Sequence, residues 1–237
     1  MIVLERTPSG IPGFDKLVES GLPAGNTMLL SGSCGTGKSI FALQFAYQGA
    51  KEYNEPAVFI TLEQKPDEII KVMQTFGWDV DSLIKKKKLL IVKPRGESLQ
   101  NLEELIFSSV QEIHAKRLVI DSISLLGMYF KDDWELRKGI KELHWSIKEL
   151  ACTTFFISDI KEHSSLYSPS GFEEFIVDGV IVLRIISKEA GGGHTRALFI
   201  RKMRGTEHSL DVFPMKIGKT GVEVFPNLRI FEQEYQK

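Results

Sequence analysis

The sequence predicts an α/β protein built on a mostly parallel, twisted sheet flanked by helices, with antiparallel strands toward the C-terminus. Three observations support this fold class. Short apolar or β-branched runs alternate with helical patterns, an order typical of parallel sheets covered by helices. A glycine-rich segment joins the first run to a helical pattern, and after about residue 174 strand patterns follow one another without helices. The four alternating runs span residues 28–31, 57–62, 118–121 and 153–158.

Composition limits the class of protein. The 237 residues are 43% hydrophobic and 26% charged, which is ordinary for a globular chain, and we expect residues 1–237 to form a single domain. A net charge of −1 gives no overall reason to expect a nucleic-acid or membrane partner. Because no uninterrupted apolar run approaches a membrane span, we expect a soluble, cytoplasmic protein. The two cysteines, Cys34 and Cys152, lack the spacing of a zinc site.

The first strand run leads into a glycine-rich turn that fits G-x-x-x-x-G-K-[ST], the pattern of a Walker A loop. Glycines in this pattern let successive N–H groups point at phosphate oxygens, while Lys38 can reach the β- and γ-phosphates and Ser39 can bind Mg²⁺. A helix beginning after the turn adds its positive dipole end. The alternative, a turn that binds nothing, is disfavoured by this strand, turn and helix order. The expected nucleotide contacts are Gly32, Ser33, Cys34, Gly35, Thr36, Gly37, Lys38, Ser39 and Ile40.

The second strand run ends in Thr61-Leu62-Glu63-Gln64. A glutamate at this position can lie beside a γ-phosphate and polarise the attacking water, so Glu63 is a candidate catalytic base. The alternative is that Glu63 caps the helix that starts near Pro66. Spacing alone does not decide between the two.

Helical patterns fill the space between the second and fourth runs. Pro66 stands at an expected first helical position and Gly77 at the end of that helix, and residues 89–92 add a further strand. Apolar residues recur at three- and four-residue spacing along two more helices, and we interpret these stripes as core faces. The stripes are Leu102, Leu105, Ile106, Val110 and Ile113 in one helix, and Leu136, Ile140, Leu143, Ile147 and Leu150 in the other.

The third strand run, Leu118 to Asp121, has the form of a Walker B strand, an apolar run that ends in a carboxylate. Asp121 can hold Mg²⁺ through a water molecule at the carboxyl end of the sheet. Buried strands also end in aspartate at ordinary turns, so the Walker B interpretation is supported mainly by the presence of the Walker A loop.

The C-terminal part has strand character at residues 175–186, 195–201 and 212–217, with a hairpin tip expected at 190–193. Lys202 and Arg204 alternate along a strand, so both side chains point to one face. They could belong to a solvated edge strand, which charges protect from aggregation, or they could reach a phosphate in the same or a neighbouring subunit.

These segments together resemble the KaiC-like branch of the RecA/RadA ATPase superfamily. The resemblance covers nearly the whole chain, and the K-x-R-G-[ST]-x-H element is more specific than the Walker A loop. The matching segments are TPSGIPGFD at 7–15, GLPAG at 21–25, GSCGTGKS at 32–39, TLEQKP at 61–66, VIDS at 119–122 and KMRGTEH at 202–208.

The resemblance implies a RecA-like core that assembles into a homo-oligomeric ring, commonly a hexamer, with ATP between subunits. On that pattern, Lys38, Ser39 and Asp121 serve the subunit's own nucleotide and Mg²⁺. Lys202 and Arg204, with His208 nearby, would reach the nucleotide of the next subunit. An arginine supplied in this way can raise the rate by about 10³ to 10⁵.

One residue departs from the family pattern, because Gln64 stands where a second glutamate is typical. Hydrolysis can still use Glu63, at a rate that this change leaves open. The leading hypothesis is an ATPase ring whose nucleotide state switches its assembly or the binding of a protein partner that the sequence does not identify. The alternatives are a RadA-like paralogue that binds single-stranded DNA, an autokinase, and a ring in which ATP is structural glue.

The superfamily pattern also places two channel-lining loops at about residues 124–134 and 161–172. The second loop contains Tyr167 and His163 but few basic residues, whereas single-stranded DNA binding usually needs basic grooves as well as aromatic platforms. Nucleic acid is therefore a disfavoured partner. A circadian clock function is not expected, since the clock member of the family has two such domains.

Overall fold

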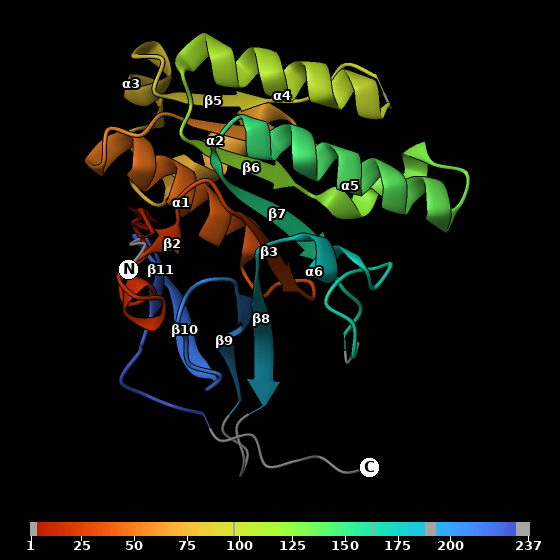
Figure 1. Ribbon diagram of the computed structural model, residues 1–237. Helices are drawn as coiled ribbons and strands as arrows, with labels where there is room; N and C mark the ends of the chain where they lie inside the picture. Colours follow the sequence, from red (N-terminus) through yellow and green to blue (C-terminus); the bar gives the residue numbers. More distant parts are fainter. Residues whose placement is uncertain (1–3, 97, 163, 188–192, 231–237) are drawn as a thin grey trace.

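The computed structural model describes residues 4–96, 98–162, 164–187 and 193–230. These residues form a nine-stranded sheet with the order β11-β10-β9-β8-β3-β7-β6-β4-β5 (Figure 1). Neighbours from β8 to β5 are parallel, whereas β9, β10 and β11 are antiparallel additions on one side, which confirms the predicted fold class. The strands are β3 (Thr27–Gly32), β4 (Ala57–Thr61), β5 (Leu89–Val92), β6 (Arg117–Asp121), β7 (Thr153–Asp159), β8 (Gly179–Ser187), β9 (His194–Met203), β10 (Phe213–Gly218) and β11 (Gly221–Val224), with β1 (Arg6–Thr7) and β2 (Leu22–Pro23) paired separately.

Helices cover both faces of the sheet (Figure 1). The side chains of each strand alternate between the faces, so Met28 and Leu30 of β3 pack in the cluster that includes α1, while Leu29 packs with α4 and α5. The core is thus split into two layers by the sheet. The helices are α1 (Lys38–Glu52), α2 (Pro66–Thr75), α3 (Val80–Lys85), α4 (Leu99–Ile113), α5 (Asp133–Glu149) and α6 (Glu173–Ile176), with 3₁₀ segments η1 (Asp15–Leu17) and η2 (Ile123–Tyr129).

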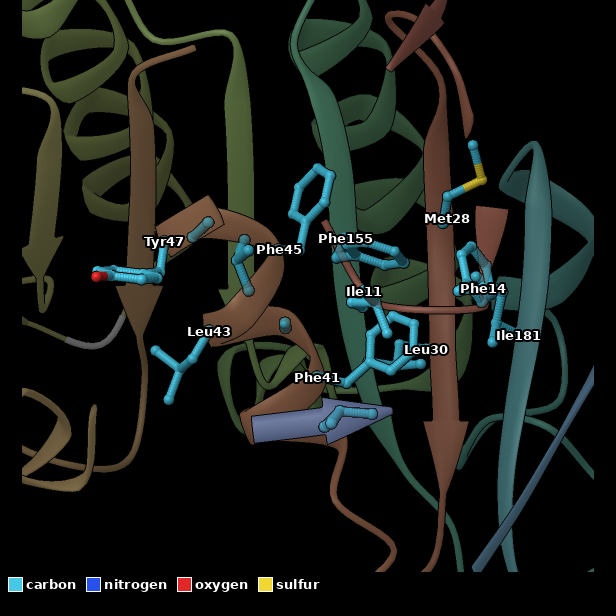
Figure 2. Close-up of a cluster of buried hydrophobic side chains, with 14 of the residues drawn as sticks. Ile11, Phe14, Met28, Leu30, Phe41, Leu43, Phe45, Tyr47, Phe155 and Ile181 are labelled. Atoms are coloured by element: carbon cyan, nitrogen blue, oxygen red, sulfur yellow. The ribbon is translucent and has the colours of Figure 1, made fainter. Parts of the chain in front are cut away.

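Aromatic side chains fix α1 to the sheet (Figure 2). Phe41 and Phe45 of α1 meet Phe155 of β7 edge to face, with ring centroids 5.8 and 4.8 Å apart. Phe14 makes a similar contact with Phe41 at 5.4 Å. All four rings are fully buried. Because edge-to-face pairs add to the energy of area burial, these contacts hold α1, and with it the turn that precedes it, in one position.

Most elements lie close to where the sequence predicts them, but the region before β8 differs. Phe175 and Ile176 were expected at the start of a strand, but they belong to α6, and β8 begins at Gly179. An apolar run by itself does not distinguish a short helix from a strand. β8 also pairs in parallel with β3, so it belongs to the parallel part of the sheet. Of the tip expected at 190–193, residues 190–192 lie outside the described residues.

The carboxyl ends of the parallel strands meet at one edge of the sheet. Gly32 of β3 is the register partner of Asp159 of β7, and Thr61 of β4 is the partner of Asp121 of β6. In open parallel sheets this is the edge at which ligands bind.

Candidate functional site

The glycine-rich turn connects β3 to α1 at this edge. Gly37, directly before α1, has a φ of 101°, which lies in the left-handed region that glycine adopts without strain. Gly32 has no room for a side chain, because a Cβ there would lie 2.7 Å from both the Leu183 carbonyl oxygen and Thr36 Oγ1. The Thr36 hydroxyl donates to the Ser33 carbonyl at 2.9 Å. The turn is therefore folded tightly upon its own backbone.

The first turn of α1, like that of any helix, has N–H groups without a partner inside the helix. Gly37 occupies the N-cap position, and as a glycine it has no side chain to accept a hydrogen bond from them. Free N–H groups and the positive end of the helix dipole together form a site for an anion such as phosphate. The geometry of the turn thus fits the triphosphate that the sequence pattern predicts.

Lys38 is the charged residue of the turn, and its side chain is only 7% exposed. Its Nζ donates to the Ser33 carbonyl at 2.9 Å and lies 2.9 Å from Asp159 Oδ1. Asp159, at the end of β7, is a site residue that the sequence prediction missed. It comes directly after the predicted run at 153–158, so the signal was a carboxylate at the end of a parallel strand, as for Asp121.

Asp121 lies beside Ser39, whose hydroxyl donates to the carboxylate. Burial is the main reason that the pKa of Asp121 rises to about 6, and the nearby carboxylates of Asp159 and Glu63 raise it further. The Ser39 hydrogen bond and Lys38 act in the opposite direction. Carboxylates that raise the pKa of one another mark a place where a cation is favourable.

Oxygen ligands for Mg²⁺ are available here in the number that a nucleotide-bound ion needs. Mg²⁺ is usually held by one or two carboxylates together with waters and substrate phosphates. Ser39 and Asp121 supply a hydroxyl and a carboxylate beside the turn. Within the described ranges no group of three or more His, Cys, Asp and Glu residues is arranged to hold a metal ion unaided.

Glu63 follows β4, next to the strand that carries Asp121. The Leu62 amide donates to the Asp121 carbonyl at 2.7 Å, and the Thr61 hydroxyl accepts from the Gln64 amide at 3.0 Å, so this turn is fixed from both sides. Glu63 itself is exposed. The helix-capping alternative does not hold, because the carboxylate that accepts from the α2 N-cap amide belongs to Glu68.

Lys202 and Arg204 lie at the other edge of the sheet. At the level of Gly32, the partner on β8 is Leu183, which in turn pairs with Leu198 of β9. Met203 lies at another level, because it pairs with Gly179, whose partner is Met28 near the beginning of β3. Four residues of strand separate the two levels, a distance of about 13 Å along the strand. Neither cation therefore reaches the turn of its own chain.

β9 lies between β8 and β10 in the strand order, but it pairs with β10 only from Arg196 to Leu198, so Lys202 has a strand partner on the β8 side alone. Arg204 follows the end of β9. Both side chains contact the segment that leads into β8. Lys202 Nζ donates to the carbonyls of Glu174 and Val177 at 2.9 and 2.7 Å. Arg204 donates to the Phe175 carbonyl at 3.1 Å and remains about half exposed. His208 follows four residues later, and burial lowers its pKa.

The two expected channel segments lie close together but differ from the loops that the sequence suggested. The first is mostly ordered as η2, because Ile123 and Leu126 are buried under the sheet. Both segments line a cavity of about 280 Å³ whose charged residues are Lys131, Asp132, Asp133 and Glu173. This lining is more acidic than basic. His163, named with the second segment, lies outside the described residues.

No helix among the described residues is both long and apolar enough to cross a membrane.

Comparisons with known proteins agree on one family. The family model described as "ATPase: KaiC" matches residues 7–229. The UPF0273 protein MJ1359 of Methanocaldococcus jannaschii is 35% identical over 243 residues, which cover 94% of this chain and 98% of that protein. The circadian clock oscillator protein KaiC of Synechococcus elongatus is 35% identical over 226 residues, which cover 91% of this chain and 43% of the relative. The chain thus spans less than half the length of that curated KaiC relative.

A solved structure supports the same grouping. The crystal structure of the KaiC-like protein PH0186 from Pyrococcus horikoshii superposes with a TM-score of 0.86 at 41% sequence identity. The match covers 94% of this chain and 100% of that one.

Proposed function

The chain belongs to the KaiC family of ATPases, and from this membership we propose that residues 1–237 act as one domain that binds and hydrolyses ATP with Mg²⁺ between subunits of a homo-oligomeric ring. We expect the ring to be a hexamer. Its nucleotide state would switch its assembly or the binding of a protein partner.

The observation that carries this proposal is the separation of the two halves of the site. Lys38, Ser39, Asp121 and Glu63 gather at the carboxyl edge of the parallel strands, whereas Lys202 and Arg204 lie at the opposite edge. Lys202 and Arg204 can complete a phosphate site only when a second subunit packs the edge that carries them against the glycine-rich turn of the first subunit. One subunit then supplies the turn and its neighbour supplies the cations.

Each residue has a role that follows from its place. The N–H groups of the turn and of the first turn of α1 hold the phosphates, and Lys38 exchanges Asp159 for phosphate oxygens. Ser39 and Asp121 hold Mg²⁺, which neutralises charge that develops on the phosphates. Glu63 orients a water molecule and accepts its proton. Lys202 and Arg204 of the neighbour, with His208 close to them, stabilise the charge of the transferred phosphoryl group.

The proposal is tested by Mg²⁺-dependent ATP turnover of purified protein, with Lys38→Ala as the blank. Arg204→Ala is the test variant. Arg201→Ala is the matched control, because Arg201 lies in β9 just before the turn that carries Arg204, but its guanidinium lies over the Tyr167 ring. Turnover that falls by about 10³-fold or more in Arg204→Ala, leaving a measurable residual rate, and that is kept in Arg201→Ala supports the proposal. Turnover that Arg204→Ala leaves unchanged contradicts it.

A second candidate function keeps ATP as structural glue with little turnover. It is favoured by Gln64, which stands beside Glu63 where the family typically has a second glutamate, and by the exposure of Glu63. Sizing the protein with and without ATP separates the two functions. Assembly that depends on ATP without measurable hydrolysis would favour structural glue.

Binding of single-stranded DNA is less well supported. The cavity between the two expected channel segments carries three acidic residues and one lysine, whereas nucleic-acid grooves are basic. A mobility-shift assay with single-stranded DNA, with and without ATP, tests this function, and incorporation of labelled phosphate tests autokinase activity.

A further inference from the structure

The two cations at the amino edge are held by one short segment of their own chain. Lys202 contacts the carbonyls of Glu174 and Val177, and Arg204 contacts the carbonyl of Phe175. The Arg204 amide also donates to the Asp178 carbonyl at 3.0 Å. Residues 173–178, which comprise α6 and the two residues before β8, therefore hold both side chains. We name this segment the α6–β8 clamp.

Asp178 is the clamp residue whose side chain forms an ion pair with Arg204, and its two oxygens face different partners. Oδ1 lies 3.4 Å from Arg204 Nη1. Oδ2 accepts from the Thr27 amide at 3.0 Å and from Lys148 Nζ at 2.9 Å. One oxygen is thus anchored to β3 and α5, and the other is turned toward the arginine.

The carboxylate is kept charged by these contacts. Burial alone would raise the pKa of Asp178, but the neighbouring His144, the Thr27 amide and Lys148 outweigh burial and lower it. The side chain is 12% exposed, whereas that of Arg204 is 52% exposed. A charged acceptor therefore faces an arginine that is held by its own chain yet remains about half exposed.

We propose that Asp178 is a positioning residue that orients Arg204 before the neighbouring subunit arrives. This inference rests on the function proposed above, in which Arg204 acts on the nucleotide of the next subunit. A free arginine side chain has many rotamers, and fixing it in advance removes that ordering cost from the reacting complex. Asp178 acts through Arg204 and does not touch the nucleotide itself.

The test is a double-mutant cycle on kcat and KM for ATP, combining Asp178→Asn with Arg204→Ala. Asparagine retains an oxygen for the Thr27 amide, but its amide group presents a donor where Arg204 needs an acceptor. We expect Asp178→Asn to lower kcat by about 10²-fold, the effect of misplacing a catalytic group by about 1 Å. KM for ATP should stay unchanged, because the turn that holds the nucleotide belongs to the other subunit.

The double variant should turn over no more slowly than Arg204→Ala alone, since a positioning residue has nothing left to position. Glu112→Gln is the matched control, because it removes a carboxylate from an exposed pair with Lys87 far from the clamp. Asp178→Ser, which removes the carboxylate and leaves a shorter hydroxyl on the same side of the backbone, replaces the asparagine variant if circular dichroism shows that variant to be unfolded.

Unchanged kcat in Asp178→Asn overturns the inference, as does a double variant that is slower than Arg204→Ala by the full Asp178→Asn factor. Normal turnover in Arg204→Ala alone would be a different result. It would contradict the proposed function itself, on which the role of Asp178 depends.

Discussion

Lys38 Nζ lies 2.9 Å from Asp159 Oδ1, so the lysine of the glycine-rich turn has an anionic partner within its own chain. The lysine side chain is almost fully enclosed, whereas that of Asp159 is 52% exposed. On the proposed function, binding of ATP would exchange the Asp159 carboxylate for phosphate oxygens at the same ammonium group.

Replacing Asp159 with alanine should destabilise the nucleotide-free protein and increase the stabilisation that Mg-ATP provides. The Lys38–Asp159 ion pair is weakened by solvent because the Asp159 side chain is exposed. Without ATP, we therefore expect the free energy of unfolding to fall by no more than about 1 kcal/mol. Phosphate oxygens replace the missing partner when ATP binds. Melting temperatures of both proteins with and without Mg-ATP measure this, and an ATP-induced shift smaller than that of the unmutated protein would count against the exchange.

Gly32→Ala should abolish ATP binding and lower stability. An added Cβ would lie 2.7 Å from the Leu183 carbonyl oxygen, which belongs to a sheet strand and has little freedom to move. Gly218→Ala is the matched control, because a Cβ there would meet its nearest neighbour at an ordinary 3.8 Å. Fluorescent-nucleotide titration and thermal melts distinguish the variants. Normal affinity in Gly32→Ala would mean that the turn is not the nucleotide site.

Glu63→Gln should retain ATP binding while lowering turnover by about 10² to 10⁴, the usual contribution of a general base. Gln64→Ala is the neighbouring control, because the Gln64 amide that Thr61 holds is part of the backbone and survives the substitution. Turnover and nucleotide affinity are measured side by side. If Gln64→Ala is as slow as Glu63→Gln, the catalytic assignment of Glu63 is wrong.

Asp121→Asn should stabilise the protein at neutral pH when metal and nucleotide are absent. The folded state holds the proton of Asp121 up to about pH 6, above the 3.8 of an exposed carboxyl, so ionisation destabilises the fold as pH rises through this window. Asparagine avoids that cost, which is at most about 3 kcal/mol. Urea unfolding at about pH 7.5 and about pH 4.5 should show a gain that shrinks at the lower pH. An equal gain at both would contradict the raised pKa.

The sheet and its helices could be predicted because each depends on local pattern. The strand that becomes β5 and the helix that begins at Pro66 follow directly from β-branched runs and from helix start signals. The start of β8 could not be placed in the same way. Phe175 and Ile176 are apolar in either state, and only the packing of α6 against α5 selects the helix.

The candidate site was predictable where a motif carries its own mechanism, as in the turn with Lys38 and Ser39. Asp159 required knowledge of which strand lies beside β3, since its role depends on the Gly32 register pair. The contacts of Lys202 and Arg204 with the α6–β8 clamp required the antiparallel register of β8 and β9. Relationships across strands are not encoded by spacing along the chain.

The most direct test of the shared site is complementation between two inactive variants. Lys38→Ala has a defective turn but intact cations, and Arg204→Ala has the reverse defect. When the two proteins are mixed under conditions that allow subunits to exchange, interfaces form that pair an intact turn with an intact Arg204. The account predicts that ATP turnover appears in the mixture although each protein alone is inactive. A mixture that exchanges subunits, as shown by sizing with a labelled variant, yet remains inactive would contradict it.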